Sequence, residues 1–264
     1  MIRKQSNGEY VEYFDGLIDE VRIQSTARGV DWWKAQYLSM TDAFITFSDP
    51  SNDGTTGGGM SSGDLVTGQI AGGLDFDGTD DHVDLGNPSS FDFGTGNWTI
   101  SGWFKGPLVP QRSIVANGGD DSGGIRWFLG VNDFSEMKLT CDDNSLKIST
   151  LGTTDVTDGS WHWGTAVRDG TTLRIYTDGT EENTNTCAAG YDLSGTSQRN
   201  AYIGAITNHS TGSLYKYMVG EIDEVRVAST ARSADWIAAQ YLSMTDKFIR
   251  WGIKIILWQE VDPY

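Results

Sequence analysis

The strongest constraint on the fold of this 264-residue chain is a long internal repeat. Residues 16–45 recur at 220–249 without a gap, with 22 of 30 positions identical and a constant offset of 204 residues. That offset is far longer than a solenoid unit and has the length of a whole domain. We therefore predict that residues 1–47 are the closing strand and helix of a preceding copy, and that 74–247 are one complete copy.

Two segments lie outside the predicted copies. Residues 48–73 are rich in Gly, Ser, Thr and Asp, which is typical of a linker, with room for one short strand near 65–70. Residues 248–264 form an apolar, β-prone tail.

The complete copy has the pattern of an all-β fold. Glycine accounts for 33 residues, and turn dipeptides such as Asp169-Gly170 and Asp178-Gly179 separate short runs of β-prone residues. Strands without intervening helices predict a sandwich or barrel. One amphipathic helix is expected at 233–244, with Ser233 as its N-cap. We expect strands near 74–77, 81–85, 97–105, 112–116, 125–131, 136–141, 145–149, 160–168, 172–177, 200–206 and 215–227.

The charge balance excludes several partners. The sequence contains 36 acidic and 19 basic residues, and its net charge of −17 would repel nucleic acid and anionic membrane surfaces. No apolar run is long enough to insert into a membrane.

The first eight residues lack the apolar region of a secretion signal, so the chain is either cytosolic or a segment of a longer exported protein. The repeat favours the second interpretation. Cys141 and Cys187 leave one disulfide open.

Four motifs in order resemble the laminin-G-like branch of the concanavalin A-like lectin/glucanase superfamily. They are LDFDGTDDHVDL at 74–85, WTISGWF at 98–104, DGSWH at 158–162 and GEIDEVRV at 220–227. The resemblance covers about 74–245 and implies a two-sheet antiparallel jelly roll with one short C-terminal helix. It also implies an extracellular or cell-surface location, a role in cell adhesion, and calcium or glycan binding. The helix and the YLSMTD sequence resemble a bacterial variant found in long tandem surface proteins.

A catalytic site is not expected. Glu221-Ile222-Asp223 is similar to the start of the signature of laminarinase-like members, whose mechanism needs two glutamates. Val225 and Arg226 occupy the positions where the second glutamate would stand. No other nucleophile, base or metal motif is present. We therefore predict that the protein is not an enzyme.

A calcium site is expected from the acidic residues. Strand alternation places Asp223 on the same face as Val225 and Val227, so it would be buried if the valines face the core. By the resemblance, the position of Asp223 supplies a structural calcium ligand together with the opening segment. We predict a calcium ion bound by Asp77, Asp80 and Asp223. Alternatively, Asp223 caps backbone N–H groups.

A rim of loops is the candidate ligand-binding site. The predicted residues are Asp120, Asp121, Asp142, Asp143 and Trp127. The acids would bind calcium or a glycan, and the indole would stack on a sugar ring. The alternatives are solvated loops and a tryptophan in the core.

The two ends of the chain are candidates for assembly. The apolar residues of the first-copy helix and of the tail need partners, either in the same chain or in a neighbouring copy. They are Trp32, Trp33, Tyr37, Trp251, Ile255, Leu257 and Trp258. We therefore expect a non-catalytic extracellular structural or adhesive module that assembles head to tail with copies of itself or with neighbouring repeats, with a filament as one outcome. The alternative is a glycan-binding, lectin-like module.

Overall fold

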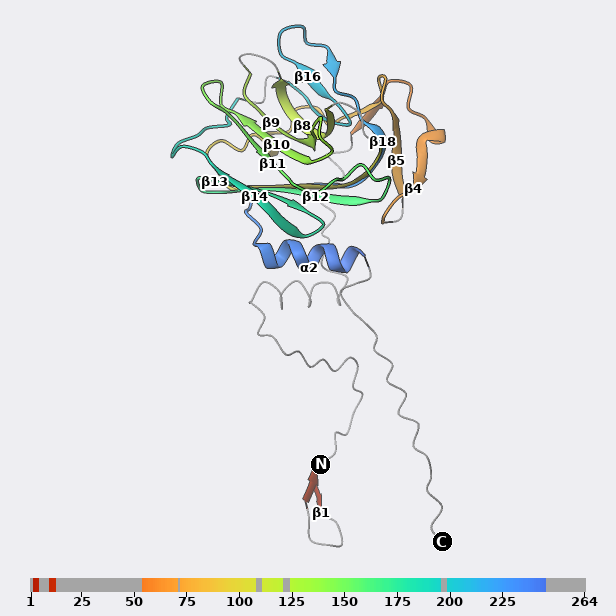
Figure 1. Ribbon diagram of the computed structural model, residues 1–264, viewed down its shortest axis with the longest axis vertical. Coiled ribbons are helices and arrows are strands. Elements are labelled where there is room, and N and C mark those ends of the chain that lie inside the picture. Colours follow the sequence, from red (N-terminus) through yellow and green to blue (C-terminus); the bar gives the residue numbers. More distant parts are fainter. Residues whose placement is uncertain are drawn as a thin grey trace.

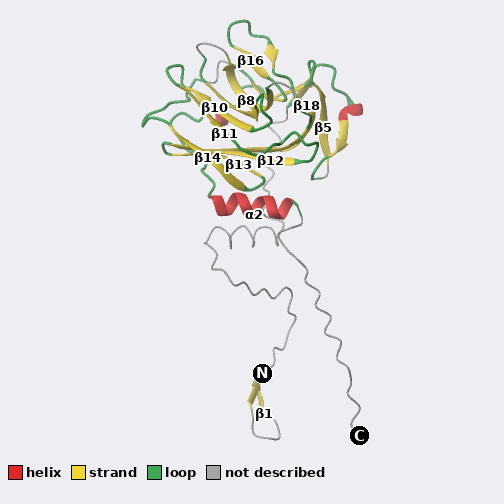
Figure 2. Cartoon of the chain, in the orientation of Figure 1, coloured by secondary structure: helices red, strands yellow, loops and turns green. Residues whose placement is uncertain are grey.

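The computed structural model describes residues 2–4, 10–12, 54–70, 72–107, 111–120, 124–195 and 199–245. Within these ranges two large β-sheets face each other, and one α-helix lies outside them (Figures 1 and 2). A separate antiparallel pair is formed by β1 (Ile2–Lys4) and β2 (Tyr10–Glu12). This architecture confirms the predicted all-β jelly-roll sandwich with a single short helix.

The first sheet has seven antiparallel strands in the order β14-β13-β12-β7-β18-β5-β4. Their bounds are β4 (Leu65–Thr67), β5 (Gly72–Asp77), β7 (Trp98–Lys105), β12 (His162–Asp169), β13 (Thr172–Thr177), β14 (Thr180–Thr186) and β18 (Val219–Ala228). The predicted hairpin around Asp169-Gly170 joins β12 to β13.

The second sheet has nine strands, and its main path runs β11-β10-β9-β8-β15-β6-β3. Their bounds are β3 (Thr55–Gly57), β6 (His82–Asp84), β8 (Arg112–Asp120), β9 (Arg126–Val131), β10 (Met137–Asp142), β11 (Lys147–Leu151), β15 (Ala201–Ile203), β16 (Ile206–Asn208) and β17 (Leu214–Tyr215). β16 pairs with β8 in parallel and with β17 in an antiparallel hairpin. Two short 3₁₀ helices, η2 (Ser62–Asp64) and η3 (Ser89–Phe91), precede β4 and β7.

The main core lies between the two sheets. It is made by side chains that alternate inward along each strand, for example Trp98, Ile100 and Phe104 of β7 against Leu129 of β9. Both cysteines are free thiols buried in this core. The disulfide that the sequence left open between Cys141 and Cys187 is therefore not formed.

A second apolar layer lies under α2 (Ala234–Met244), on the outer face of the seven-stranded sheet (Figure 1). Ser233 caps the helix as predicted, because its hydroxyl accepts a hydrogen bond from the N–H of Trp236 at 3.3 Å. Met244 packs on Trp103 and Trp163, whose rings stack 6.0 Å apart. No helix in the described ranges is long and apolar enough to cross a membrane.

The structure corrects the interpretation of residues 48–73 as a linker for the part it describes. β3 pairs with β6 at one edge of the nine-stranded sheet, and β4 pairs with β5 at one edge of the seven-stranded sheet. The strand allowed for near 65–70 is therefore present as β4, but β3 was not predicted. These edges are stabilised by backbone pairing, which a composition rich in Gly and Ser does not reveal.

Two further differences concern strands. β14, a sequence of Thr, Glu and Asn residues, was not predicted, and the strand expected at 215–227 is divided into β17 and β18. β18 also contains a bulge between Asp223 and Arg226, where Glu224 has a φ of 52°. The bulge shifts the alternation of side chains along the strand.

Candidate functional site

The predicted calcium ligands are only partly brought together. Asp77 and Asp80 lie with Asp81 in the turn between β5 and β6, where carboxylate oxygens of all three approach within 4.8 Å of one another. Asp77 accepts a hydrogen bond from the N–H of Thr79 at 2.7 Å, and Asp81 accepts one from the N–H of Asp77 at 3.0 Å. The turn therefore gathers three carboxylates within five residues.

Asp223 lies outside this cluster. Asp77 is opposite Val219, four residues along β18 from Asp223, which corresponds to about 13 Å. Because of the bulge, Ile222 and Val225 pack toward the core, whereas Asp223 is on the outer face of the sheet. The expectation that Asp223 shares a face with the valines is therefore wrong.

Asp223 instead caps backbone N–H groups, as the alternative interpretation proposed. Its Oδ2 accepts a hydrogen bond from the N–H of Ile70 at 2.7 Å. Gly68 lies against the same carboxylate, where a Cβ would come within 2.5 Å of Oδ2. Burial raises the pKa of Asp223, and the N–H of Ile70 opposes that effect.

The Asp77–Asp80–Asp81 cluster has a donor set that suits a hard cation. All its ligand atoms are carboxylate oxygens, and Asp77 and Asp80 are exposed. Burial raises the pKa of Asp81, and the neighbouring charges of Asp77, Asp64 and Asp80 add to that effect. A bound cation would remove this repulsion. Calcium was predicted on Asp77, Asp80 and Asp223; the structure groups Asp81, and not Asp223, with the first two, and the ion itself stays a prediction.

Asp142 and Asp143 of the predicted rim already have partners within the protein. Asp142 forms an ion pair with the buried Arg126 at 3.3 Å and accepts a hydrogen bond from the N–H of Asn144. Asp143 accepts hydrogen bonds from the N–H groups of Ser145 and Leu146. Asp120 ends β8, with no side chain described, and Asp121 lies outside the described residues.

Trp127 does not have the predicted role. Its side chain is completely buried in the main core, and its Nε1 donates to the carbonyl oxygen of Phe91 at 3.2 Å. An indole in this position has no face for a sugar ring. Alternation in β9 places Trp127 inward with Leu129, which is the core alternative.

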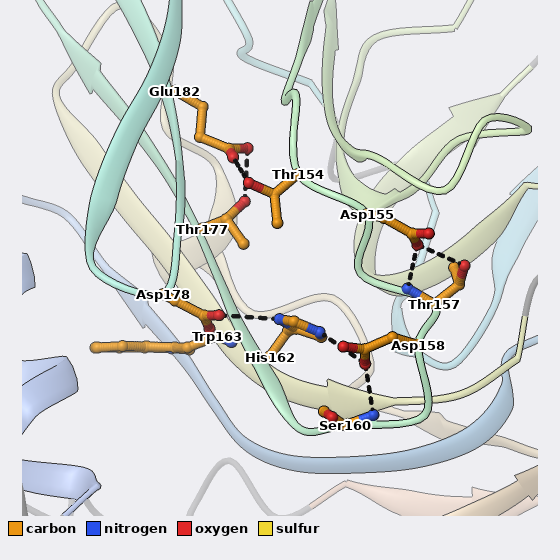
Figure 3. A network of polar contacts seen from close by, with 10 residues as sticks. All are labelled: Thr154, Asp155, Thr157, Asp158, Ser160, His162, Trp163, Thr177, Asp178 and Glu182. Carbon is orange, nitrogen blue, oxygen red and sulfur yellow. Dashed lines mark hydrogen bonds and ion pairs between the residues drawn. The ribbon is translucent and has the colours of Figure 1, made fainter.

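His162 is held between two carboxylates (Figure 3). Its Nδ1 lies 2.9 Å from Oδ2 of Asp178 and its Nε2 lies 3.2 Å from Oδ1 of Asp158. The hydrogen bond to Asp178 raises the pKa of His162, and burial partly opposes it. Asp178 also accepts a hydrogen bond from the N–H of Trp163. Both ring nitrogens are engaged and the ring is buried, so this network joins three chain segments and leaves no nitrogen to transfer a proton to a substrate.

The most exposed large apolar side chain among the described residues belongs to Phe134, at 77% exposure. It lies in the turn between β9 and β10, which is tightly held. The amide oxygen of Asn132 accepts hydrogen bonds from the N–H groups of Phe134 at 2.7 Å and Glu136 at 3.0 Å. The amide nitrogen of Asn132 donates to Glu136 Oε2 at 2.9 Å. An aromatic ring is thus presented to solvent on a fixed turn.

Polar groups lie on the same turn and beside Asp133. Gln111 donates to Asp133 from its backbone N–H at 3.1 Å and from its side chain at 3.0 Å. The side-chain hydrogen bond of Gln111 lowers the pKa of Asp133, and the charges of Lys138 and Lys216 lower it further. Lys216 lies over the ring of Tyr215, with Nζ 5.1 Å from the ring centroid. We call Gln111, Asn132, Asp133, Phe134 and Lys138 the aromatic turn.

The sequence contained one signal for the aromatic turn. Asn-Asp-Phe-Ser at 132–135 places an aromatic residue within a run of turn-forming residues, between two apolar strands. The exposure of an aromatic ring cannot be recognised in such a run, and the predicted rim contained acids and a tryptophan instead.

The residues predicted for assembly lie outside the described residues. They are Trp32, Trp33, Tyr37, Trp251, Ile255, Leu257 and Trp258.

Comparison with known families decides the classification. The family model Laminin_G_3, described as "Concanavalin A-like lectin/glucanases superfamily", matches residues 77–238, which is more than half of the chain. The chain belongs to this superfamily. The resemblance of its four motifs is thereby confirmed. No curated protein sequence matches the chain.

Solved structures show the superfamily fold at low sequence identity. The CBM40 domain of the Ruminococcus gnavus IT-sialidase is 16% identical, with a TM-score of 0.55 over 64% of this chain and 96% of that one. Domain 4 of AbnA, an extracellular GH43 arabinanase from Geobacillus stearothermophilus, is 16% identical, with a TM-score of 0.52 over 72% and 89%.

A third similar structure is the binding domain of Paraclostridial Mosquitocidal Protein 1, with 14% identity and a TM-score of 0.53. The match covers 68% of this chain and 45% of that structure, so the chain spans less than half of it. At these identities the three structures show a common fold.

Proposed function

We propose that this protein is a non-catalytic carbohydrate-binding module that acts outside the cell or at its surface, as an adhesive part of a larger polypeptide. The observation that carries the proposal is Phe134, 77% exposed on a turn fixed by hydrogen bonds. An exposed aromatic ring on a turn that carries an acid, with an amide bonded to that acid and a lysine in the following strand, offers the apolar face and the hydrogen bonds that a sugar ring requires.

Two similar structures support this class of ligand. The CBM40 domain was solved bound to α2,3-sialyllactose, and domain 4 of AbnA was solved in complex with arabinotriose. The proposal transfers to this chain only the class of ligand, a carbohydrate. The aromatic turn is the surface proposed to bind it.

The non-catalytic part of the proposal rests on two observations. Asp223, which belongs to the only partial catalytic signature found, is committed to capping Ile70. His162, which has the carboxylate partners of a general base, has both nitrogens engaged. A glycan that binds should therefore be recovered intact by mass spectrometry after prolonged incubation.

A glycan array probed with the full chain, followed by calorimetry on the retained glycans, tests the proposal. Phe134→Ala should lower the affinity at least tenfold, which corresponds to about 1.4 kcal/mol of binding free energy. Leu146→Ala is the matched control, because Leu146 is an apolar residue, 50% exposed, in the β10–β11 turn at the other end of β10. Retention of no glycan, or binding that survives Phe134→Ala, would contradict the proposal.

A further inference from the structure

A polar pocket lies where the β12–β13 hairpin meets the segment that joins β18 to α2. It is lined by Asn97, Asp169 and residues 229–233, and its volume is about 350 Å³, which is within the range of sites for small molecules. Asn97, Asp169, Ser229 and Thr230 are exposed, so the pocket is open to solvent. None of these residues belongs to the aromatic turn.

The pocket and the aromatic turn lie at opposite ends of β18. The lining segment begins at Ser229, directly after Ala228, the last residue of that strand. The aromatic turn lies near the first residue of the strand, because Arg112, which follows Gln111, donates from Nη1 to the carbonyl oxygen of Val219 at 3.2 Å. A strand of ten residues is about 30 Å long. A ligand in the pocket would therefore leave the aromatic turn free.

Hydrogen bonds fix the acidic side of the pocket. The amide oxygen of Asn97 accepts a hydrogen bond from the N–H of Gly170 at 2.8 Å, and its amide nitrogen donates to Oδ1 of Asp169 at 3.4 Å. Asp169-Gly170 forms the hairpin turn between β12 and β13, in which Gly170 has a φ of 59°. The carboxylate of Asp169 is thus held in place, while its Oδ2 has no hydrogen-bond partner among the described residues.

The basic side of the pocket is fixed as well. The buried hydroxyl of Thr99 donates to the carbonyl oxygen of Thr230 at 2.7 Å and accepts a hydrogen bond from the N–H of Arg232 at 2.9 Å. The guanidinium of Arg232 lies over the buried ring of Trp236, with Cζ 4.5 Å from the ring centroid. A contact with the face of the guanidinium leaves its edge for a ligand. No carboxylate in the described part of the chain forms an ion pair with Arg232.

We propose that this pocket binds a small zwitterion, a molecule that carries both an ammonium group and a carboxylate. Asp169 would accept hydrogen bonds from the ammonium group, and Arg232 would donate two parallel hydrogen bonds to the carboxylate. A ligand with one charge would leave the second protein charge without a partner. A neutral sugar would form hydrogen bonds without the added strength that opposite charges give them. The net charge of −17 disfavours ligands that are only anionic.

A series of ω-amino acids, from β-alanine to ε-aminocaproate, tests the class of ligand in the full chain. Its members differ only in the separation of the two charges, so the series does not require the distance between Asp169 and Arg232 to be known. By calorimetry, at least one member should bind at least about tenfold more tightly than the alkylamine and the carboxylic acid of the same length and than methyl α-glucoside. Equal affinities for these probes, or no binding of any ω-amino acid, would overturn the proposal.

Two substitutions test the location. Asp169→Asn leaves an Asn-Gly sequence, which the hairpin turn favours, and Arg232→Gln keeps the backbone N–H that Thr99 accepts. Each should weaken the binding of the best ω-amino acid at least about tenfold. Asp75→Asn and Arg174→Gln are the matched controls, because they change the same charges at other sites. Equal effects of the site and control variants would contradict the assignment.

A measurement on the wild type does not depend on the folding of any variant. During a titration with the best ω-amino acid, the side-chain amide signals of Asn97 should shift in nitrogen-15 NMR spectra, because this amide is bonded to Asp169. The backbone signal of Phe134 should stay unchanged. Shifts at Phe134 in place of Asn97 would assign the binding to the aromatic turn and overturn the proposal.

Discussion

Asp223 and Ile70 are 153 residues apart in sequence, and their 2.7 Å hydrogen bond holds the segment before β5 against the last strand of the domain. Asp223→Ala would leave the half-buried N–H of Ile70 without its acceptor. We expect a loss of about 2 kcal/mol in the free energy of unfolding, measured by urea denaturation. Asp75→Ala, at an exposed position of β5, should change it by less than about 0.5 kcal/mol. Equal losses would show that the cap contributes nothing specific.

The network of His162 should make stability depend on pH. The pKa of His162 is raised in the folded protein, first by its hydrogen bond to Asp178. The stabilisation is therefore complete below the unfolded value of about 6.5 and is lost as the pH rises through the folded value. The difference in unfolding free energy between the wild type and His162→Gln should shrink from pH 5.5 to 8.5. His209→Gln serves as the control, and a difference that grows with pH would be the wrong sign.

Calcium should reverse the effect of one substitution in the Asp77–Asp80–Asp81 cluster. Without calcium, Asp81→Asn removes a buried charge next to other acids and keeps an acceptor for the N–H of Asp77, so the melting temperature should rise slightly. With calcium at a hundred times its Kd, the wild type should gain about 2.7 kcal/mol and the variant much less. Asp75→Asn is the control. A wild-type melting temperature that is the same in calcium and in chelator would exclude a structural ion.

Asn132 is the buried member of the aromatic turn, 4% exposed, so we expect it to support binding by holding the turn and not by contacting the ligand. Asn132→Ala would release the N–H groups of Phe134 and Glu136, so the aromatic ring would lose its fixed position. We expect a three- to tenfold weaker glycan affinity with a larger entropic cost by calorimetry, because the ring must be ordered on binding. Asn144→Ala, in the β10–β11 turn, should leave the affinity unchanged. Affinity that is unaffected by Asn132→Ala would mean that the turn needs no preorganisation.

One buried amide should be replaceable with a gain in stability. Asn117 of β8 is 1% exposed, and neither atom of its amide has a hydrogen-bond partner. It is opposite Trp127 and so faces the core. Asn117→Leu should raise the unfolding free energy by about 1 kcal/mol, whereas Asn117→Asp should lower it by several kcal/mol. A destabilised leucine variant would indicate that a water molecule satisfies the amide.

Strand identity was largely predictable, because the inward residues of strands such as β7 and β9 alternate with a period of two. The strands that were missed have no such pattern. β14 is polar on both faces and is stabilised by pairing with β13 across the Asp178-Gly179 turn, where both residues have positive φ. β3 is a three-residue edge strand in a glycine-rich segment.

The site was less predictable for a different reason. Asp223 was assigned to the wrong face because the bulge at Glu224 adds one residue to the strand, which reverses every side chain after it. Asp77 and Asp80 were named because the family resemblance implies calcium ligands in the opening segment, and their role as ligands stays a prediction. Phe134 was missed because the exposure of a ring depends on neighbours that are distant in sequence, such as Gln111.

The composition of β14 limits how these domains can meet. It is the free edge of the seven-stranded sheet, and its side chains are Thr, Glu and Asn, most of them exposed. The opposite edge, β4, offers only three residues. A polar edge strand on one side and a short edge strand on the other offer few backbone groups with which a strand of another sheet could pair. Fibre growth by extension of the sheet is therefore disfavoured. A second copy of this domain would then be contacted through side chains and loops, with each sandwich remaining a separate unit.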